Sequence, residues 1–364
     1  MNSPPTETGT SPALYESIRL KEFSVTWAGS NSTGTGFCFG SEDGRLLFTD
    51  ENGCPLNDPR PGSLSGEAIN GVARLNDWLA VSTRGDLTFH SLAPDASSTG
   101  SVEGPFGAHD ITSDCSYFFV APLGREGIML MSADSVSQQL FYVLRIHHEN
   151  LYFHRVHSLR SQSGKDFLVA ACRRGGMCIS EVDPAGGTSI SRSVSPENMD
   201  VVDVCTIAGG PGVAAVARDG TLLLVRDATD WDCPASRRKI DAILGTAYRL
   251  LYAQGNLCIL TSQGLYVLLQ LGQRLVEGLQ SVDFDIQVAR IRFEAVDATV
   301  VGDRWLLVVM PDEVRRYDLN RIAARIPESP RNGQMQDIYQ SPLTTAPLQF
   351  QRLSSELKKL VPAA

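Results

Sequence analysis

Four histidines that lie close together form the densest group of potential metal ligands in the chain. They are His147, His148, His154 and His157, and neutral imidazoles bind zinc well. Their spacing matches no known set of zinc ligands. If residues 140–148 and 151–159 form a hairpin, alternate side chains point to opposite faces, so at most two histidines converge. We therefore expect surface or interface histidines and no metal.

Other signatures of catalysis are absent from the sequence or unspecific. The chain has no Gly-x-Ser-x-Gly, no phosphate-binding loop ending in Gly-Lys-Ser/Thr, no His-Glu-x-x-His and no dinucleotide-binding glycine pattern. The carboxylate pairs Asp200/Asp203 and Asp283/Asp285 can hold a cation in principle. With 41 acidic residues in the chain, however, such pairs arise by chance. We expect no catalytic residue and no cofactor.

A short sequence motif recurs seven times, and its strands are the elements that position these residues. Each copy is an apolar strand, a tight turn and a second apolar strand. The copies are 37–50, 79–92, 118–134, 168–183, 214–227, 258–271 and 306–319. Their turn residues are Gly44, Gly85, Gly127, Gly176, Gly220, Gly264 and Glu313, spaced 41, 42, 49, 44, 44 and 49 apart. A period of roughly 40 to 50 residues built from strands is typical of a β-propeller, so the sequence predicts an all-β, seven-bladed propeller.

The turn of each copy carries the best-patterned charge. Arginine occurs there in copies two to five, at Arg84, Arg125, Arg173, Arg174 and Arg218. Equivalent turns of a propeller emerge on one face, so these side chains form a crescent. Arginine suits bidentate recognition of carboxylate or phosphate groups. The alternative is that exposed turns carry arginine only for solubility.

The strands outside the motif complete the blades. In the first blade we expect strands at 23–29, 35–41 and 45–50, and in the fifth at 201–209, 212–218 and 221–227. Outer strands are expected at 137–147, 188–194, 238–244 and 283–289. The last blade lacks one, and residues 13–20 show the alternation of a strand. We predict that they pair with the last blade and close the ring, because an open edge is a liability.

The ends of the chain lie outside the repeats. Residues 1–12 are rich in Pro, Ser and Thr and are expected to be disordered. The propeller is expected to span 13–325, followed by a proline-containing extension at 326–364. Within it, Leu353, Leu357 and Leu360 recur at helical spacing and predict an amphipathic helix at 348–361. That helix packs on the propeller rim or docks on a partner.

Composition narrows the class of protein. The net charge is −9, which argues against nucleic-acid or anionic-membrane binding. The eight cysteines form no Cys-x-x-Cys pair and several lie in predicted strands, as buried reduced thiols do. No secretory signal and no membrane-spanning stretch is evident. We expect a soluble, cytoplasmic protein.

Two copies, SEDGRLLFTD (41–50) and ARDGTLLLVRD (217–227), resemble the WD-repeat (WD40) propeller family. That family closes its repeats with a tight Asp-Gly turn, here Asp43-Gly44 and Asp219-Gly220, and a terminal Asp. Closing acids here are Asp50, Asp134, Asp183, Asp227 and Asp318, and residues 107–110 resemble its Gly-His element. No blade carries the family's Trp before the closing Asp. The resemblance implies a scaffold that presents loops to protein or peptide partners.

From these observations we expect a non-enzymatic scaffold or adaptor of a multiprotein complex, with partners that include acidic or phosphorylated segments. One alternative is a propeller enzyme with a cation bound in its channel. A second is a reader of acidic, phosphorylated or nucleic-acid ligands that uses the arginine crescent.

Overall fold

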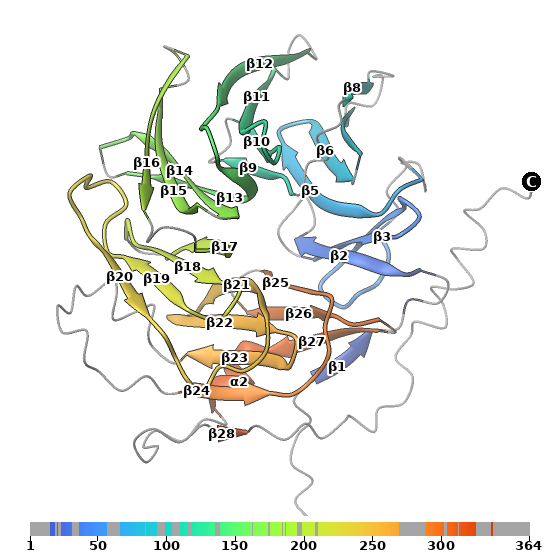
Figure 1. Cartoon of the computed structure of the whole chain (residues 1–364). Helices are drawn as coiled ribbons and strands as arrows, with labels where there is room; N and C mark the ends of the chain where they lie inside the picture. The colour runs from blue at the N-terminus through green and yellow to red at the C-terminus, as the bar shows by residue number, and fades with distance from the viewer. Residues whose placement is uncertain are drawn as a thin grey trace, which may run out of the picture.

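The computed structural model contains seven small antiparallel sheets arranged around a central axis (Figure 1). Each sheet is one blade, and the chain passes from blade one to blade seven in order. The structure describes residues 15–18, 20, 23–30, 36–56, 66–83, 85–92, 99–103, 110–114, 118–134, 139–161, 163–173, 175–183, 185, 187–194, 199–207, 210–268, 288–301, 304–311, 313–324 and 336–337.

The first four blades follow the predicted order from inner to outer strand. Blade one is β2 (Val25–Ser30), β3 (Phe37–Ser41) and β4 (Leu46–Thr49), and blade two is β5 (Ile69–Leu75), β6 (Trp78–Thr83), β7 (Asp86–Ser91) and β8 (Thr99–Glu103). Blade three is β9 (Thr112–Asp114), β10 (Phe118–Pro122), β11 (Ile128–Asp134) and β12 (Gln139–Ile146). Blade four is β13 (Tyr152–Arg160), β14 (Asp166–Arg173), β15 (Gly176–Asp183) and β16 (Thr188–Val194).

The last three blades continue this order, and the final one borrows a strand from the start of the chain. Blade five is β17 (Val201–Thr206), β18 (Val213–Ala217), β19 (Leu222–Val225) and β20 (Ala235–Arg238). Blade six is β21 (Ala247–Ala253), β22 (Asn256–Thr261), β23 (Gly264–Leu268) and β24 (Val288–Ile291). Blade seven is β25 (Asp297–Val301), β26 (Trp305–Val309), β27 (Val314–Asp318) and β1 (Tyr15–Ile18).

The hydrophobic core is a circle of seven clusters, one at each junction between neighbouring blades. Middle strands such as β3, β6 and β18 are buried along their whole length, because both faces of the blade are covered by other blades. At the junction of blades two and three, the rings of Phe89 and Phe119 lie 5.4 Å apart. The other junctions are filled by both aliphatic and aromatic side chains.

Two of the predicted turn glycines are required by their backbone conformation and by close contacts, as well as by the shortness of the turn. Gly127 and Gly264 adopt positive φ angles of 100° and 126°, which side chains of L-residues rarely allow. A Cβ at Gly127 would also collide with the carbonyl of Ile146, and one at Gly264 with the carbonyl of Ile291. In both blades the turn therefore lies against the end of the outer strand.

The predicted closure of the ring is confirmed. β1 pairs antiparallel with β27, with Tyr15 opposite Tyr317 and Ile18 opposite Val314. Arg316 forms an ion pair with Glu16, and Ser17 donates a hydrogen bond to Glu313. Ile18 is buried in the cluster that joins blade seven to blade one. The first and last blades are thus joined by one short strand.

One prediction about outer strands was wrong, the hairpin considered for the histidines does not form, and one predicted outer strand lies partly outside the described residues. The outer strand of blade five is β20 at Ala235–Arg238 rather than 238–244, because the chain turns at 241–242. Segments 140–148 and 151–159 form no hairpin: β12 ends blade three, and β13 begins blade four. Of the predicted 283–289, only 288–289 are described, at the start of β24. In the described part of blade one, Thr49 makes an isolated bridge to Pro55 beyond its three strands.

Two short elements follow the last blade. Helix α2 (Leu319–Ala324) continues from β27, and β28 (Gln336–Asp337) adds a parallel fifth strand to β24 of blade six. The sequence predicted neither. The predicted helix at 348–361 and the tail at 1–12 lie outside the described residues. No helix in the described ranges is both long enough and apolar enough to cross a bilayer.

Removal of β1 is expected to destabilise the whole propeller. Deletion of residues 1–22 removes the four β1–β27 pairs and the buried Ile18, and should lower the free energy of unfolding by at least about 3 kcal/mol. Deletion of residues 1–11 leaves β1 intact and serves as the control. Denaturant unfolding measures both, and equal stability of the two truncations would contradict the closure.

Candidate functional site

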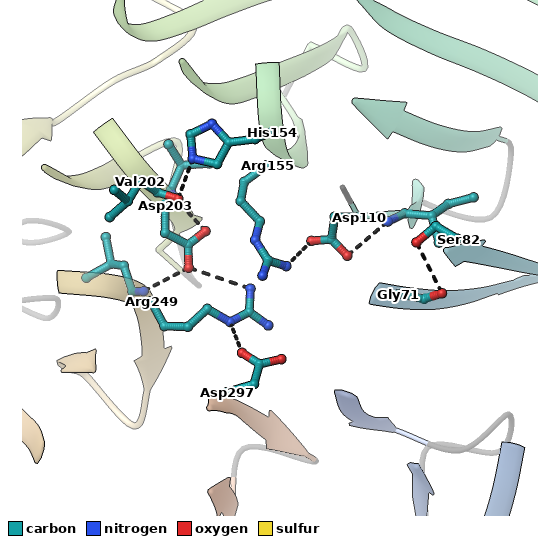
Figure 2. Close-up of polar contacts among 12 residues, drawn as sticks. Gly71, Ser82, Asp110, His154, Arg155, Val202, Asp203, Arg249 and Asp297 are labelled. Carbon is teal, nitrogen blue, oxygen red and sulfur yellow. Dashed lines mark hydrogen bonds and ion pairs between the residues drawn. The ribbon is translucent and has the colours of Figure 1, made fainter. Parts of the chain in front are cut away.

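Five charged side chains from consecutive blades converge at the propeller axis. They are Asp110, Arg155, Asp203, Arg249 and Asp297, one from each of blades three to seven, and Figure 2 shows them directed toward one another. Acid and base alternate around the axis. We call these five residues the axial ring.

Local backbone geometry aims the ring residues inward. In β13, β17 and β21 the register against the next strand shifts immediately before Arg155, Asp203 and Arg249. One extra residue at such a bulge re-aims the side chains beside it. Asp110 lies two residues before β9, and Asp297 is the first residue of β25.

Ion pairs connect the ring residues from blade to blade. Arg155 Nη1 lies 2.5 Å from Asp110 Oδ2 and joins blade four to blade three. Arg249 Nε lies 2.6 Å from Asp297 Oδ1, and its Nη1 lies 3.7 Å from Asp203 Oδ2. Arg249 therefore links blade six to both of its neighbours.

Backbone amides also donate hydrogen bonds to the carboxylates of the axial ring. In each of the three ring aspartates, Oδ1 accepts a hydrogen bond of 2.9 Å from the N–H of the next residue. The second oxygen of Asp203 accepts the N–H of Leu250 at 2.8 Å, from the neighbouring blade. The side chains of Asp203 and Arg249 are only 1% and 9% exposed. Buried charges persist only when they are paired and hydrogen-bonded.

Blades one and two complete the circle without charge. The corresponding positions, just after the same register shift, are Trp27 and Gly71. A Cβ at Gly71 would lie 2.7 Å from Oδ1 of Asp110, so glycine is required for the aspartate to fit. The hydroxyl of Thr26 donates to the carbonyl of Ile69 at 2.8 Å and joins blades one and two.

The four histidines fall into two separate places. His147 and His148 lie in the connection between β12 and β13, whereas His154 and His157 lie on β13 near the axis. His154 Nε2 is 2.8 Å from the carbonyl oxygen of Val202 in blade five. Burial lowers the pKa of His154 to about 4, although that carbonyl favours the charged form, and burial also lowers the pKa of His157. These two imidazoles are therefore neutral at physiological pH.

The axial ring is arranged to connect blades rather than to bind a ligand. Its carboxylates already accept hydrogen bonds from guanidinium groups and amides, so they are not arranged as free ligands. Burial by itself lowers the pKa of Arg155, but the carboxylates of Asp110, Asp203 and Asp297 raise it above its ordinary value, which keeps the guanidinium charged. In the portion of the chain that is described, no group of three or more His, Cys, Asp or Glu residues is suited to a metal ion.

The described cysteines are mostly buried, as predicted. Cys38, Cys172, Cys178, Cys205, Cys233 and Cys258 are free and buried, Cys54 is half-buried, and Cys115 lies outside the described residues. Burial raises the pKa of the Cys258 thiol to about 12. A thiol with such a pKa is unreactive at neutral pH.

The predicted arginine crescent is described only in part. Arg125, Arg173 and Arg218 lie on exposed turns, and Arg84 and Arg174 are outside the described residues. Arg218 forms an ion pair with Asp200, with Nε 2.7 Å from Oδ2. Asp200, paired with Asp203 in the sequence, thus lies at a turn, whereas Asp203 lies in the axial ring. Asp283 and Asp285 are outside the described residues.

Arg125 lies at a turn of blade three, and Arg173 ends β14 in the adjacent blade four. The guanidinium of Arg173 lies 5.6 Å from the centre of the Tyr152 ring. Gly124, the residue before Arg125, lies against the same ring and exchanges two 3.0 Å backbone hydrogen bonds with Phe153. We call Arg125, Tyr152 and Arg173 the basic cluster. The paired backbone holds it in place before any ligand binds.

A groove of about 570 Å³ lies at the junction of blades seven and one. Apolar side chains including Ile18, Phe23 and Val314 line it. Glu42 and Glu313, from the turns of these two blades, add acidic groups. Turns of equivalent strands emerge on one face, so this groove and the basic cluster share that face.

The axial ring was missed in the sequence: Asp203 was noted only within a chance pair and Asp110 only at the end of the Gly-His element. The spacings of its residues, 45, 48, 46 and 48, follow the blade period. One charged residue per repeat, 15 to 21 residues before each turn residue, is the signal that could have found them.

Protonation of the axial histidine is expected to weaken the fold. Because the pKa of His154 is about 4 in the folded protein and about 6.5 when unfolded, only the unfolded chain takes up its proton between these values. The free energy of unfolding should therefore fall as pH drops from about 6.5 to 4, by about 2 to 3 kcal/mol from this group. His154→Gln should flatten this slope and His147→Gln, at an exposed site, should not. Identical slopes for both variants would contradict the assignment.

Comparison with known proteins supports the architecture and goes no further. No family model matches the chain, and no curated protein sequence matches it. Among solved structures, the β-propeller domain of Cps50 (Swd1) from Myceliophteria thermophila is similar, with a TM-score of 0.60 and 13% identity over 83% of this chain and 99% of that one. U3-55K is similar with a TM-score of 0.61 and 11% identity over 84% and 98%. The protein has the fold of a seven-bladed, WD40-like β-propeller.

Proposed function

We propose that the protein is a non-enzymatic scaffold that binds protein partners on the face of the propeller where the tight turns emerge. The observation that carries the proposal is that the charged side chains at the propeller axis are already paired with one another. A propeller enzyme with a cation bound in its channel needs free carboxylates there, but the aspartates of the axial ring are engaged by Arg155, Arg249 and backbone amides. The fold thus uses its buried charge to hold blades together.

The basic cluster is the part of that face best suited to an acidic or phosphorylated segment. Two exposed guanidinium groups on adjacent blades, one of them over an aromatic ring, offer bidentate hydrogen bonds and a flat surface for contact. Arg125 and Arg173 are exposed, and the paired hydrogen bonds between Gly124 and Phe153 fix the backbone beneath them. The protein therefore loses little conformational entropy when a ligand binds there.

The groove at the junction of blades seven and one lies on the same face, across the ring from the basic cluster. Its apolar lining can receive a hydrophobic side chain of a partner, while Glu42 and Glu313 favour a basic residue beside it. The two regions differ in charge, so a partner that spans the face has a defined orientation. Complementary charges mainly raise association rates and set orientation, and contribute less to affinity.

Charge reversal at the basic cluster tests the proposal. The probes are a short Glu/Asp peptide and its phosphoserine counterpart, with binding followed by fluorescence anisotropy at several salt concentrations. Each exposed ion pair contributes roughly 0–1 kcal/mol, so the double variant Arg125→Glu/Arg173→Glu should bind about tenfold more weakly. Its binding should also depend less on salt.

Arg160→Glu is the matched control. Arg160 is an exposed arginine at the end of β13, on the opposite side of blade four from Arg173. It should retain wild-type binding. Binding by the double variant equal to that of Arg160→Glu would show that the basic cluster is only solvated surface.

A further inference from the structure

The groove at the junction of blades seven and one combines apolar surface with an excess of negative charge. Leu20, Val25 and Met310 line it and are only half-buried, so they offer apolar surface to a ligand. Its charged lining residues are three acids and one base, which lie at the tight turns of the two blades: Glu42, Asp43, Arg45 and Glu313. A segment that is both apolar and basic complements this groove.

Among the described residues, Glu42 is the one acid of the groove with which no arginine or lysine pairs. Asp43 and Glu313 each form an ion pair with the arginine two residues further along the chain, at 2.7 and 2.5 Å. Glu42 is exposed, and within the described part of the chain its carboxylate accepts one hydrogen bond, from the hydroxyl of Ser24 at 3.3 Å. A lysine from a docked segment would supply the missing positive charge.

The strand β28 directs the C-terminal part of the chain toward the face that holds this groove. β24 ends at Ile291, whose carbonyl lies against the tight turn of blade six at Gly264, so β24 runs toward the turn face. β28 lies beside β24 at the rim of blade six (Figure 1) and pairs parallel to it, with Asp337 opposite Arg290. The chain after Asp337 therefore leaves blade six in the direction of the turn face.

The groove is within reach of the chain that follows β28. Ten residues, 338–347, separate β28 from segment 348–361, and an extended linker of that length spans up to about 35 Å. Neighbouring sheets pack about 10 Å apart, and only blade seven lies between blade six and the groove. A short flexible linker gives a tethered segment an effective concentration of about millimolar, so even a weak contact is populated.

Segment 348–361 has the composition that complements the groove. Leu353, Leu357 and Leu360 recur at helical spacing, which places them on one side of a helix. The segment carries three basic residues against one acidic residue. Residues 269–287, another apolar stretch outside the described residues, carry one basic residue against three acidic ones. Of these two segments, only the C-terminal one matches the groove in both apolar pattern and charge.

We infer that residues 348–361 form a helix that docks in this groove of the same chain. Its leucines lie against the apolar lining, and Lys358 or Lys359 lies beside Glu42. The helix covers Leu20 and Met310, so a partner reaches this part of the turn face only by displacing the helix. That consequence rests on the proposed function, because it assumes a partner on this face, whereas the docking itself does not.

Hydrogen exchange followed by mass spectrometry tests the docking in the full chain. A free helix of this length is marginal in water, so protection of amides 348–361 reports contact with the propeller. We expect these amides to exchange about tenfold or more slowly in the wild type than in Leu357→Asp, which places a charge on the apolar stripe. Leu348→Asp is the matched control. Leu348 lies on the opposite side of the helix from Leu357, so this variant should exchange like the wild type.

A zero-length carbodiimide cross-linker, which joins a carboxylate to an amine in direct contact, locates the docked segment. In the wild type it should link Lys358 or Lys359 to Glu42 within one chain. Leu357→Asp keeps all three of these groups and should nevertheless remove the link. Glu149 is the control carboxylate, because it is exposed in the connection between β12 and β13 and should stay unlinked.

Three outcomes would overturn the inference: exchange of residues 348–361 as fast in the wild type as in Leu357→Asp, linkage of the lysines to Glu149 as often as to Glu42, or links found only between two chains. Neither measurement involves a partner or an acidic peptide. Failure of the docking therefore leaves the peptide-binding test of the basic cluster unaffected, and failure of that test leaves the docking unaffected.

Discussion

Each blade of this protein has two apolar faces, and the rest of the structure follows from the need to cover both. A single sheet of four short strands cannot bury its own faces. Only a closed circle gives every blade two neighbours, and seven apolar clusters, one at each junction, show that the circle is complete. The pairing of β1 with β27 makes the junction of blades seven and one equivalent to the others. The geometry of every surface depends on that closure.

At the axis, ion pairs join neighbouring blades. The inner strands converge there, and their charged side chains are largely buried, so unpaired charges would be costly. Alternation of acid and base in blades three to seven lets each arginine face a carboxylate of a neighbouring blade. Gly71 provides the space in which Asp110 fits. Buried ion pairs seldom add much net stability over apolar packing, so the axial ring acts chiefly by fixing how neighbouring blades are placed.

The sequence predicted what depends on short-range pattern. The glycine turns, the middle strands and the closing strand at 13–20 follow from alternation and from the blade period. The axial ring was not predicted, because no local pattern distinguishes Arg155 and Arg249 within their strands and their partners lie about a full repeat away. The outer strand of blade five was misplaced, because solvent-facing strands such as β20 carry little apolar pattern. The histidine hairpin was wrong because a blade boundary, which has no local signature, lies between β12 and β13.

For the basic cluster, part of the site follows from the sequence pattern and part depends on how the blades are arranged in space. Arginines at equivalent turns predicted a crescent on one face, and the structure shows that one of them, Arg218, is engaged by Asp200. It also shows that Tyr152 of blade four lies between the guanidinium of Arg173 and the backbone of Gly124 in blade three. The proposed binding surface depends on which blades are adjacent, and adjacency is a property of the closed ring.

A double-mutant cycle between Arg249 and Asp297 tests most directly whether charge at the axis couples the blades. Arg249→Met keeps the length of the side chain, and Asp297→Asn keeps the oxygen that accepts the N–H of Ala298. Equilibrium unfolding of the wild type, the two single variants and the double variant yields the coupling free energy. A structural axial ring predicts a coupling of about 2 kcal/mol or more, with the double variant less destabilised than the sum of the single ones. Additive effects within about 0.5 kcal/mol would contradict it.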